Sequence, residues 1–365
     1  MKSAAFSSER AFATVDTAAL LHNFRLLKGL VAPDAPVMAV VKADAYGHGV
    51  FAVVPPLAAA GCTCFAVATL SEALEVRKLT EAAILILGYT PPARAPVLAG
   101  HRLMQTVFSL EYAKALSAVA RQSGCRVRVQ IKLDGGLCRV GLDASNAEDA
   151  LAVCRLQGLE ACGLFTHFPC PDTDPDGTAE AIKRLDVCRA ALAQKGFALP
   201  CHAAASGAAL AYPQGHFHAL RLGLSLYGIA PCTTTLPLRP VLSLYAPVVQ
   251  IRAVPSGTPV GYGGDFVTAR PTRIGTLPIG YADGFCRRLS GFSVTLLHAG
   301  RCFSAPVVGR ISMDQLTLDL TDTPAAVGDL VRLWSSATQP ASYLQTIPYE
   351  VLTALSRRVR RIVIR

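Results

Sequence analysis

The sequence lacks the features that mark disordered, membrane-spanning or secreted proteins. Only 16% of its residues are charged and 52% are hydrophobic, which excludes a disordered chain and favours a large buried core. No uninterrupted apolar stretch reaches the roughly 18 residues that a transmembrane helix needs. Glu9, Arg10 and Asp16 interrupt any apolar segment of a secretory signal. We therefore expect a cytoplasmic protein with no membrane partner.

Disulfide and metal-site patterns are also missing. The 12 cysteines are scattered through 365 residues, and none of them forms a Cys-x-x-Cys pair or another metal-ligand spacing. Most of them lie in apolar contexts, where a free cysteine behaves as a small hydrophobic residue. We expect reduced thiols and no bound metal.

The charge is unbalanced, with 35 Lys and Arg residues against 25 Asp and Glu residues, or +10 in total. Such an excess suits a nucleic-acid surface, a site for an anionic ligand, or solubility alone. No basic helix, aromatic stacking motif or zinc pattern accompanies it. We therefore expect no nucleic-acid partner.

The first part of the chain alternates short apolar runs with helical patterns. Eight runs are expected to be strands: 36–41, 64–68, 83–87, 105–108, 126–133, 161–165, 200–203 and 219–223. Helical periodicity falls between them, at 71–79, 109–123, 146–156 and 179–195. Continuous apolar strands that alternate with helices indicate a parallel sheet buried on both faces. Over this length the pattern predicts an α/β fold, a (β/α)8 TIM-like barrel in residues 1–242.

The pattern changes after residue 242. Short runs rich in Val, Ile, Leu and Thr are separated by Gly and Pro, and they predict strands at 247–254, 258–262, 273–277, 293–297, 302–308, 317–320 and 330–333. Helical periodicity returns only at 349–355. Residues 243–365 are therefore expected to form a mostly β C-terminal domain.

The most informative segment runs from Ala39 to Gly49, AVVKADAYGHG. An apolar strand ends on Lys42, and the carboxyl ends of barrel strands form the active-site face of a TIM barrel. Burial between Val41 and Ala43 would lower the pKa of Lys42 and make it a candidate Schiff-base amine. A lysine at the end of a generic strand is more often a surface residue with its charged head in water.

The segment VVKADAYGHG resembles the cofactor-lysine signature of the alanine racemase family. The resemblance extends from residues 13–16, ATVD, to the Arg-Val-Arg-Arg stretch at 358–361, so it covers both expected domains. It implies a barrel that binds pyridoxal 5'-phosphate, a β-rich second domain, and a homodimer whose active sites combine residues of both subunits. The implied activity interconverts L-alanine and D-alanine. Its role is open between D-alanine biosynthesis for peptidoglycan precursors and amino-acid breakdown.

Racemisation needs a proton acceptor and donor on each face of the α-carbon. The resemblance implies that Lys42 holds the cofactor and also serves one face. It implies that Tyr281 of the partner subunit, in the motif IGYADG, serves the other face. A phenol with a pKa near 10 needs neighbouring cations or hydrogen-bond donors to act as a base.

The resemblance assigns three residues to the cofactor ring. Arg221 would face the pyridine nitrogen, and His202 would orient Arg221. Because a guanidinium does not give up its proton, the ring would stay unprotonated and would be a weaker electron sink. A weaker sink favours racemisation over decarboxylation. His167 would stack on the ring.

Four positions resemble the phosphate-binding set of the family: Tyr46, Ser206, and the backbone amides of Gly223 and Leu224. Hydroxyl groups and loop amides at strand ends suit a phosphate dianion.

The substrate carboxylate has three expected partners. The segment that starts at Lys132 resembles the part of the family with a carbamylated lysine, which positions an arginine, here Arg139, on the cofactor and the substrate carboxylate. Lys132 is therefore a candidate for carbamylation. The second-domain segment GRISMDQ would provide the Met313 amide for the carboxylate and Asp314 as a positioning group.

The chain departs from the family pattern at several positions. Ala205 stands where the family usually has Asn, Gly135 and Leu137 replace a common Thr and Met, and Arg357 stands where some members have Tyr. These changes leave open a serine racemase or a broad-specificity racemase on the same scaffold. A decarboxylase is disfavoured, because it would need a carboxylate at the place of Arg221.

Overall fold

The computed structural model describes residues 9–32 and 35–365. The first eight residues of the segment assessed for a secretory signal lie outside this range. The described residues form two compact units. The barrel unit comprises the described residues of Leu20–Ala45 together with Val53–Arg239. The β-rich unit comprises the described residues up to Ala19, Tyr46–Ala52 and Pro240–Arg365.

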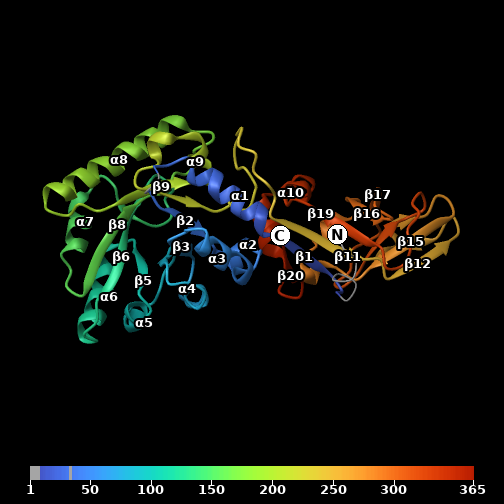
Figure 1. Ribbon diagram of the computed structural model, residues 1–365, viewed down its shortest axis with the longest axis horizontal. Coiled ribbons are helices and arrows are strands. Elements are labelled where there is room, and N and C mark those ends of the chain that lie inside the picture. Colours follow the sequence, from blue (N-terminus) through green and yellow to red (C-terminus); the bar gives the residue numbers. More distant parts are fainter. Residues whose placement is uncertain (1–8, 33–34) are drawn as a thin grey trace. The chain divides into compact units, whose positions relative to one another are not determined.

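Eight parallel strands close into a barrel in the first unit (Figure 1). In spatial order they are β2 Val37–Val40, β3 Cys64–Val67, β4 Ala83–Ile86, β5 Leu103–Val107, β6 Val127–Asp134, β8 Leu159–Phe165, β9 Cys201–Ala205 and β10 Ala219–Leu222. Strand β10 pairs with β2, and β5 pairs with β6, which closes the ring. The two-residue strand β7, Leu142–Asp143, pairs with the end of β6. The expected fold class and all eight barrel strands are confirmed.

Helices follow the strands and surround the barrel (Figure 1). They are α1 Thr17–Lys28, α3 Val50–Ala59, α4 Leu70–Arg77, α5 Ala95–Gly100, α6 Leu110–Gln122, α7 Ala147–Cys154, α8 Pro175–Gln194 and α9 Ser206–Ala211. Polar side chains cap several of these helices at the N-terminus. Ser109 accepts a hydrogen bond from the amide of Tyr112 in α6, and Asp174 accepts one from the amide of Gly177 in α8. The four helices expected between the barrel strands are confirmed.

The chain leaves β2 through a left-handed turn, labelled α2, Lys42–Tyr46. Ala43, Asp44, Ala45 and Tyr46 have φ angles of 52°, 53°, 54° and 53°. For a residue with a Cβ atom this conformation costs about 1–2 kcal/mol. Four such residues in succession persist only where surrounding contacts hold them.

The β-rich unit contains a nine-stranded sheet. In spatial order its strands are β12 Gln250–Val254, β15 Thr272–Leu277, β18 Leu316–Asp319, β17 Arg301–Val308, β16 Ser293–His298, β19 Leu330–Trp334, β11 Leu242–Pro247, β1 Phe12–Asp16 and β20 Arg360–Ile364. Strands β1 and β20 are parallel, and the other neighbours are antiparallel. A small hairpin joins β13 Pro259–Val260 to β14 Phe266–Val267.

Two helices complete this unit, α10 Thr338–Leu344 and α11 Pro348–Ala354. The strands expected at 273–277, 293–297, 302–308, 317–320 and 330–333 are present, and the expected helix at 349–355 corresponds to α11. The strand expected at 247–254 is divided between the end of β11 and β12, and only Pro259–Val260 of the strand expected at 258–262 is a strand. In this unit the sequence analysis did not expect β1, most of β11, β14, β20 or α10. No helix in the described ranges is long and apolar enough to cross a membrane. Within the same residues no cluster of His, Cys, Asp and Glu could hold a metal ion.

Candidate active site

Nine of the residues expected from the sequence lie in the barrel unit, eight of them near or just beyond the carboxyl ends of its strands and His202 on β9, opposite Phe165 at the end of β8. They are Lys42 after β2, Lys132 and Arg139 on and after β6, His167 after β8, His202 and Ser206 on and after β9, and Arg221, Gly223 and Leu224 on and after β10. The barrel therefore brings this set to one end, as parallel strands require.

Arg221 is a buried cation held by backbone carbonyl groups. Its guanidinium donates hydrogen bonds to the carbonyl oxygens of Thr166 at 2.7 Å, Ala203 at 2.7 Å and His202 at 3.1 Å. It also contacts the Nδ1 atoms of His202 at 2.5 Å and His167 at 3.3 Å. These contacts fix the guanidinium against the ends of β8 and β9.

The tautomer of His202 follows from these contacts. Because a guanidinium only donates, His202 Nδ1 must be the acceptor, and the ring proton resides on Nε2. His202 Nε2 then donates to Gln130 Oε1 at 2.5 Å. Burial and the Arg221 charge lower the pKa of His202 well below its usual value of 6.5. His202 is therefore a neutral residue that orients Arg221, the position that the resemblance implies.

Arg221 has no carboxylate partner within the described part of the chain. Burial lowers its pKa to about 9, and no acidic group opposes this effect. The guanidinium stays charged at neutral pH, with its carbon 5.3 Å from the centroid of the Phe165 ring. A buried positive charge of this kind favours a ligand with a hydrogen-bond acceptor and disfavours a second cation.

Three further cations share this end of the barrel. Burial lowers the pKa of Lys42, and the charge of Arg139 lowers it further. Burial, followed by the charges of Arg221, Arg139, Lys132 and Lys42, lowers the pKa of His167 to about 3. The charges of all four cations act on His167, which is therefore neutral at physiological pH.

Two side chains of strand β6 bind the backbone of the loop around Arg139. The Asp134 carboxylate accepts hydrogen bonds from the amides of Gly136, Leu137 and Cys138, at 3.0–3.2 Å. The Lys132 amine is buried and donates to the Val140 carbonyl at 2.6 Å. Burial lowers the pKa of Lys132 to about 8. Carbamylation of Lys132 stays a prediction.

Hydroxyl and amide groups cluster between the ends of β9 and β10. The Ser206 hydroxyl accepts hydrogen bonds from the amides of Gly223 at 3.1 Å and Ser225 at 3.2 Å, and from the Ser225 hydroxyl at 2.9 Å. Ala205 precedes Ser206 and provides no side-chain cap to α9. Hydroxyl and amide donors grouped in this way suit phosphate oxygens.

The donor set fits pyridoxal phosphate. It combines a cluster of amides and hydroxyls that suits a phosphate, a lysine with a lowered pKa that suits the aldehyde, and a guanidinium that suits the ring nitrogen and has no carboxylate partner in the part of the chain that the structure describes. Each of these groups belongs to the barrel unit.

In the β-rich unit, two loops bring together Tyr281, Met313 and Asp314. The amide of Tyr281 donates to the Ser312 carbonyl at 3.1 Å, and the amide of Ala282 donates to the Met313 carbonyl at 3.0 Å. Gly280 permits this approach, because a Cβ atom there would lie 2.2 Å from the Ser312 oxygen. The two loops carry Tyr281 and Met313, which lie 32 residues apart in the sequence, and their backbones are hydrogen-bonded to each other. We call this pair of loops the double loop.

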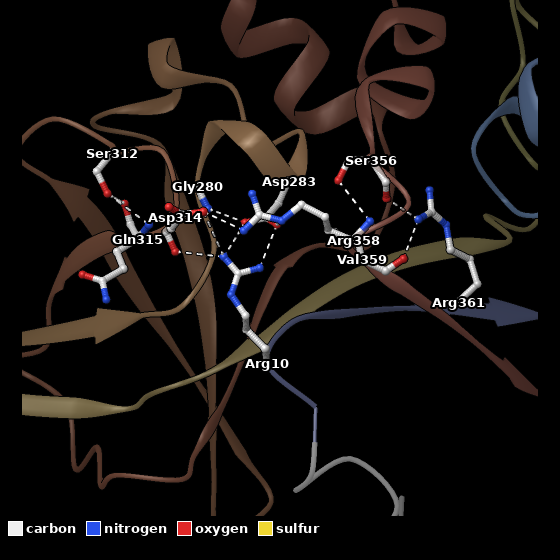
Figure 2. A network of polar contacts seen from close by, with 10 residues as sticks. All are labelled: Arg10, Gly280, Asp283, Ser312, Asp314, Gln315, Ser356, Arg358, Val359 and Arg361. Atoms are coloured by element: carbon white, nitrogen blue, oxygen red, sulfur yellow. Dashed lines mark hydrogen bonds and ion pairs between the residues drawn. The ribbon is translucent and has the colours of Figure 1, made fainter.

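A network of charges fixes this double loop (Figure 2). The fully buried Asp283 carboxylate accepts two hydrogen bonds from Arg10, at 2.8 and 2.9 Å, and one from the Gly280 amide at 3.0 Å. Arg358 lies 3.4 Å from Asp283 and donates to Asp314 at 2.6 Å. Two arginines from opposite ends of the chain thus hold both loops.

Tyr46 also belongs to the β-rich unit. Its ring lies 5.8 Å from that of Tyr349, and burial raises its pKa above the usual value of 10. The next residue, Gly47, accepts a hydrogen bond from Arg361 at 2.9 Å. Arg357 is exposed on the turn before β20.

The sequence analysis passed over Tyr262. Its side chain is 73% exposed, compared with 44% for Tyr281. Tyr262 lies in a turn in which Gly261, Gly263 and Gly264 all have positive φ angles. The Arg310 guanidinium packs against Gly263 so closely that a Cβ atom there would lie 2.9 Å from it, and Arg310 pairs with Asp265. In the sequence, the run Gly-Tyr-Gly-Gly at 261–264 is the feature that could have identified Tyr262 as an exposed turn residue.

The buried carboxylate gives a test of the loop network. Asp283→Asn weakens the hydrogen bonds that the buried carboxylate accepts from Arg10 and should lower the free energy of unfolding by about 1.5–3 kcal/mol. Asp314→Asn is the matched control, since the Asp314 side chain is 52% exposed and its ion pair is worth about 1 kcal/mol or less. Urea unfolding of both variants measures the difference. Equal losses would show that Asp283 does not anchor the loops.

Comparisons with known proteins cover both units. Residues 15–231 match the family model "Alanine racemase, N-terminal domain", and residues 241–363 match "Alanine racemase, C-terminal domain". The alanine racemase of Desulfovibrio desulfuricans is 39% identical over 96% of this chain and 97% of its own length. Alanine racemase 2 of Caldanaerobacter subterraneus is 38% identical over 96% of this chain and 94% of its own length.

Comparison with solved structures points to the same family as the sequence comparisons. The alanine racemase of Clostridium difficile superposes with a TM-score of 0.91 at 31% identity, over 98% of this chain and 96% of that chain. The alanine racemase of Bartonella henselae, solved with covalently bound pyridoxal phosphate, gives a TM-score of 0.86 at 30% identity, over 97% of this chain and 99% of that chain. With both family models matched in order and relatives aligned over nearly their full length, the chain belongs to the alanine racemase family.

Proposed function

We propose that the protein interconverts L-alanine and D-alanine, with pyridoxal 5'-phosphate bound at the carboxyl end of the barrel. The observation that carries the proposal is the buried Arg221 guanidinium, which neutral His202 orients and no described carboxylate neutralises. Bound pyridoxal phosphate supplies acidity at the α-hydrogen of an amino acid. An arginine facing its ring nitrogen limits that electron withdrawal and favours return of the proton.

Different residues of the barrel bind different parts of the cofactor and the substrate. Lys42 Nζ holds the cofactor, and the Ser206 hydroxyl with the Gly223 and Leu224 amides binds the phosphate. His167, neutral at physiological pH, stacks on the ring. Arg139 binds the substrate carboxylate. The lowered pKa of Lys42 gives its amine a neutral fraction that can accept a proton on one face of the α-carbon.

The β-rich unit supplies the opposite face in a homodimer, where its loops complete the site of the partner subunit. The Met313 amide and Asp314 bind and position the substrate carboxylate. Tyr46, four residues after Lys42, contacts the phosphate together with Ser206. For the second proton carrier the sequence analysis names Tyr281. The geometry favours Tyr262, because it is the more exposed phenol and lies on a turn in which three glycines have positive φ angles.

The activity test is a coupled assay of purified protein with pyridoxal phosphate over a panel of L- and D-amino acids. We expect turnover of both alanine enantiomers to the same equilibrium, and loss of turnover when the cofactor is removed. Turnover of serine without turnover of alanine would overturn the proposed substrate. Turnover without the cofactor would overturn the proposed chemistry.

The tyrosine assignment gives a second test, by exchange of the α-hydrogen in D2O from each enantiomer separately. Tyr262→Phe should reduce exchange from one enantiomer by about a hundredfold or more and largely spare exchange from the other. Tyr281→Phe, the matched control, should reduce both alike and by less. The reverse pattern would assign the proton transfer to Tyr281.

Mixing experiments then test whether the site is shared between subunits. Lys42→Ala and Tyr262→Phe, each inactive alone, would form hybrid dimers in which one site is intact. Random exchange of subunits makes half of the dimers hybrids, so about a quarter of the wild-type activity should return. No recovery after proven subunit exchange would place both groups in one subunit.

We also propose that the enzyme acts in the cytoplasm. All 12 cysteines are free thiols, which fits a reducing compartment. Cell fractionation tests this, and recovery of the protein outside the cytoplasmic fraction would contradict it.

A further inference from the structure

We infer that Glu72 is a positioning residue for Lys42: its carboxylate holds the peptide that follows Lys42 and so sets the direction in which the lysine side chain leaves β2. The inference rests on the proposed function, because it concerns the amine that holds the cofactor. It begins with the way in which Glu72 uses both of its oxygen atoms.

Glu72 lies in the first turn of α4, where a capping box explains part of its bonding. Thr69 Oγ1 accepts from the Glu72 amide at 3.3 Å, and Glu72 Oε2 accepts from the Thr69 amide at 3.1 Å. A capping box needs nothing more. Yet Glu72 Oε2 also accepts from the Ala68 amide at 2.7 Å, and Oε1 accepts from the Ala43 amide at 2.7 Å.

The Ala43 bond reaches across two neighbouring strands. Strand β2 pairs with β3, with Val40 opposite Ala66, and the Val41 amide donates to the Ala66 carbonyl at 2.8 Å. Beyond this last ladder bond the two chains diverge. One carboxylate then bridges the amide after Lys42 to the amides after β3, with the short distances of charge-assisted hydrogen bonds.

The backbone at this point needs such a restraint. Ala43, Asp44 and Ala45 adopt the left-handed conformation with φ angles of 52–54°. The Ala43 amide is bound to Glu72, and the Ala45 amide donates to the Val41 carbonyl at 2.9 Å. Glu72 is therefore the side chain that holds the first strained residue after Lys42.

The charge of Glu72 acts on Lys42 as well. Among the charges around the amine, Arg139 lowers the pKa of Lys42 and Glu72 raises it. Replacing Glu72 by a neutral residue removes the raising effect, so the pKa of Lys42 should fall further. A purely structural cap would not have this consequence.

The test compares Glu72→Gln with Thr69→Ala in the full-length holoenzyme and in the cofactor-free protein. Glutamine offers one acceptor oxygen in place of two, and its NH2 group faces amides that also donate. Thr69→Ala weakens the same capping box but keeps the carboxylate that binds Ala43. The two variants thus separate the cap from the restraint on Lys42.

We expect hydrogen–deuterium exchange at Ala43 to accelerate about tenfold or more in Glu72→Gln and to stay unchanged in Thr69→Ala. In the alanine assay, kcat should fall about tenfold in Glu72→Gln with KM within about threefold, and the rising limb of its pH profile should move to lower pH. Glu72→Asp, which keeps the charge, should retain the position of the limb.

Unchanged exchange at Ala43 in Glu72→Gln would overturn the inference, and so would faster exchange with unchanged kcat and pH profile. If Glu72→Gln does not fold, hydrogen–deuterium exchange at Ala43 and kcat of Glu72→Asp decide: the shorter side chain should weaken the bond to Ala43, and unchanged exchange would overturn the inference. A wild-type protein without racemase activity would refute the proposed function, whereas the exchange data would still show whether Glu72 restrains Ala43.

Discussion

The arrangement of the barrel site depends on a buried guanidinium, that of Arg221, which has no carboxylate partner among the described residues. Arg221 stays charged, so its surroundings must provide acceptors, and the carbonyl groups at the ends of β8 and β9 do so. His202 must remain neutral beside that charge, and Gln130 fixes its tautomer by accepting from Nε2. An ion pair at Arg221 would have cancelled the charge that the ring nitrogen of the proposed cofactor requires.

Two acidic side chains of the barrel unit, Asp134 and Glu72, bind backbone amides. Asp134 binds three amides of the loop that precedes Arg139, and Glu72 binds three amides around the exit of β2. Lys42, Lys132, Arg139 and Arg221 therefore give the site a surplus of positive charge. Part of the net charge of +10 belongs to this site, whose expected ligands are a phosphate and a carboxylate.

The eight barrel strands were predictable, because each is a short apolar run with a helical pattern on either side. Strands β1 and β20 were not, since they pair with each other from opposite ends of the chain, and local periodicity carries no information about that pairing. The same limit applied to Asp283, whose partner Arg10 lies 273 residues away. Motif resemblance located the cationic residues of the site, but not the carbonyl groups that hold Arg221, because every residue has a carbonyl. The sequence analysis did not consider Tyr262, which we propose as a proton carrier, because its turn was taken as part of a strand.

The most direct test of this account is the protonation state of His202. In 15N-labelled protein, with the signal assigned by its loss in His202→Gln, the ring nitrogens are followed from pH 8 to pH 5. The account predicts a neutral ring protonated at Nε2 throughout, because burial and Arg221 hold the pKa of His202 well below 6.5. A titration midpoint near 6.5, or a ring protonated at Nδ1, would mean that His202 does not accept from Arg221 and would contradict the central claim.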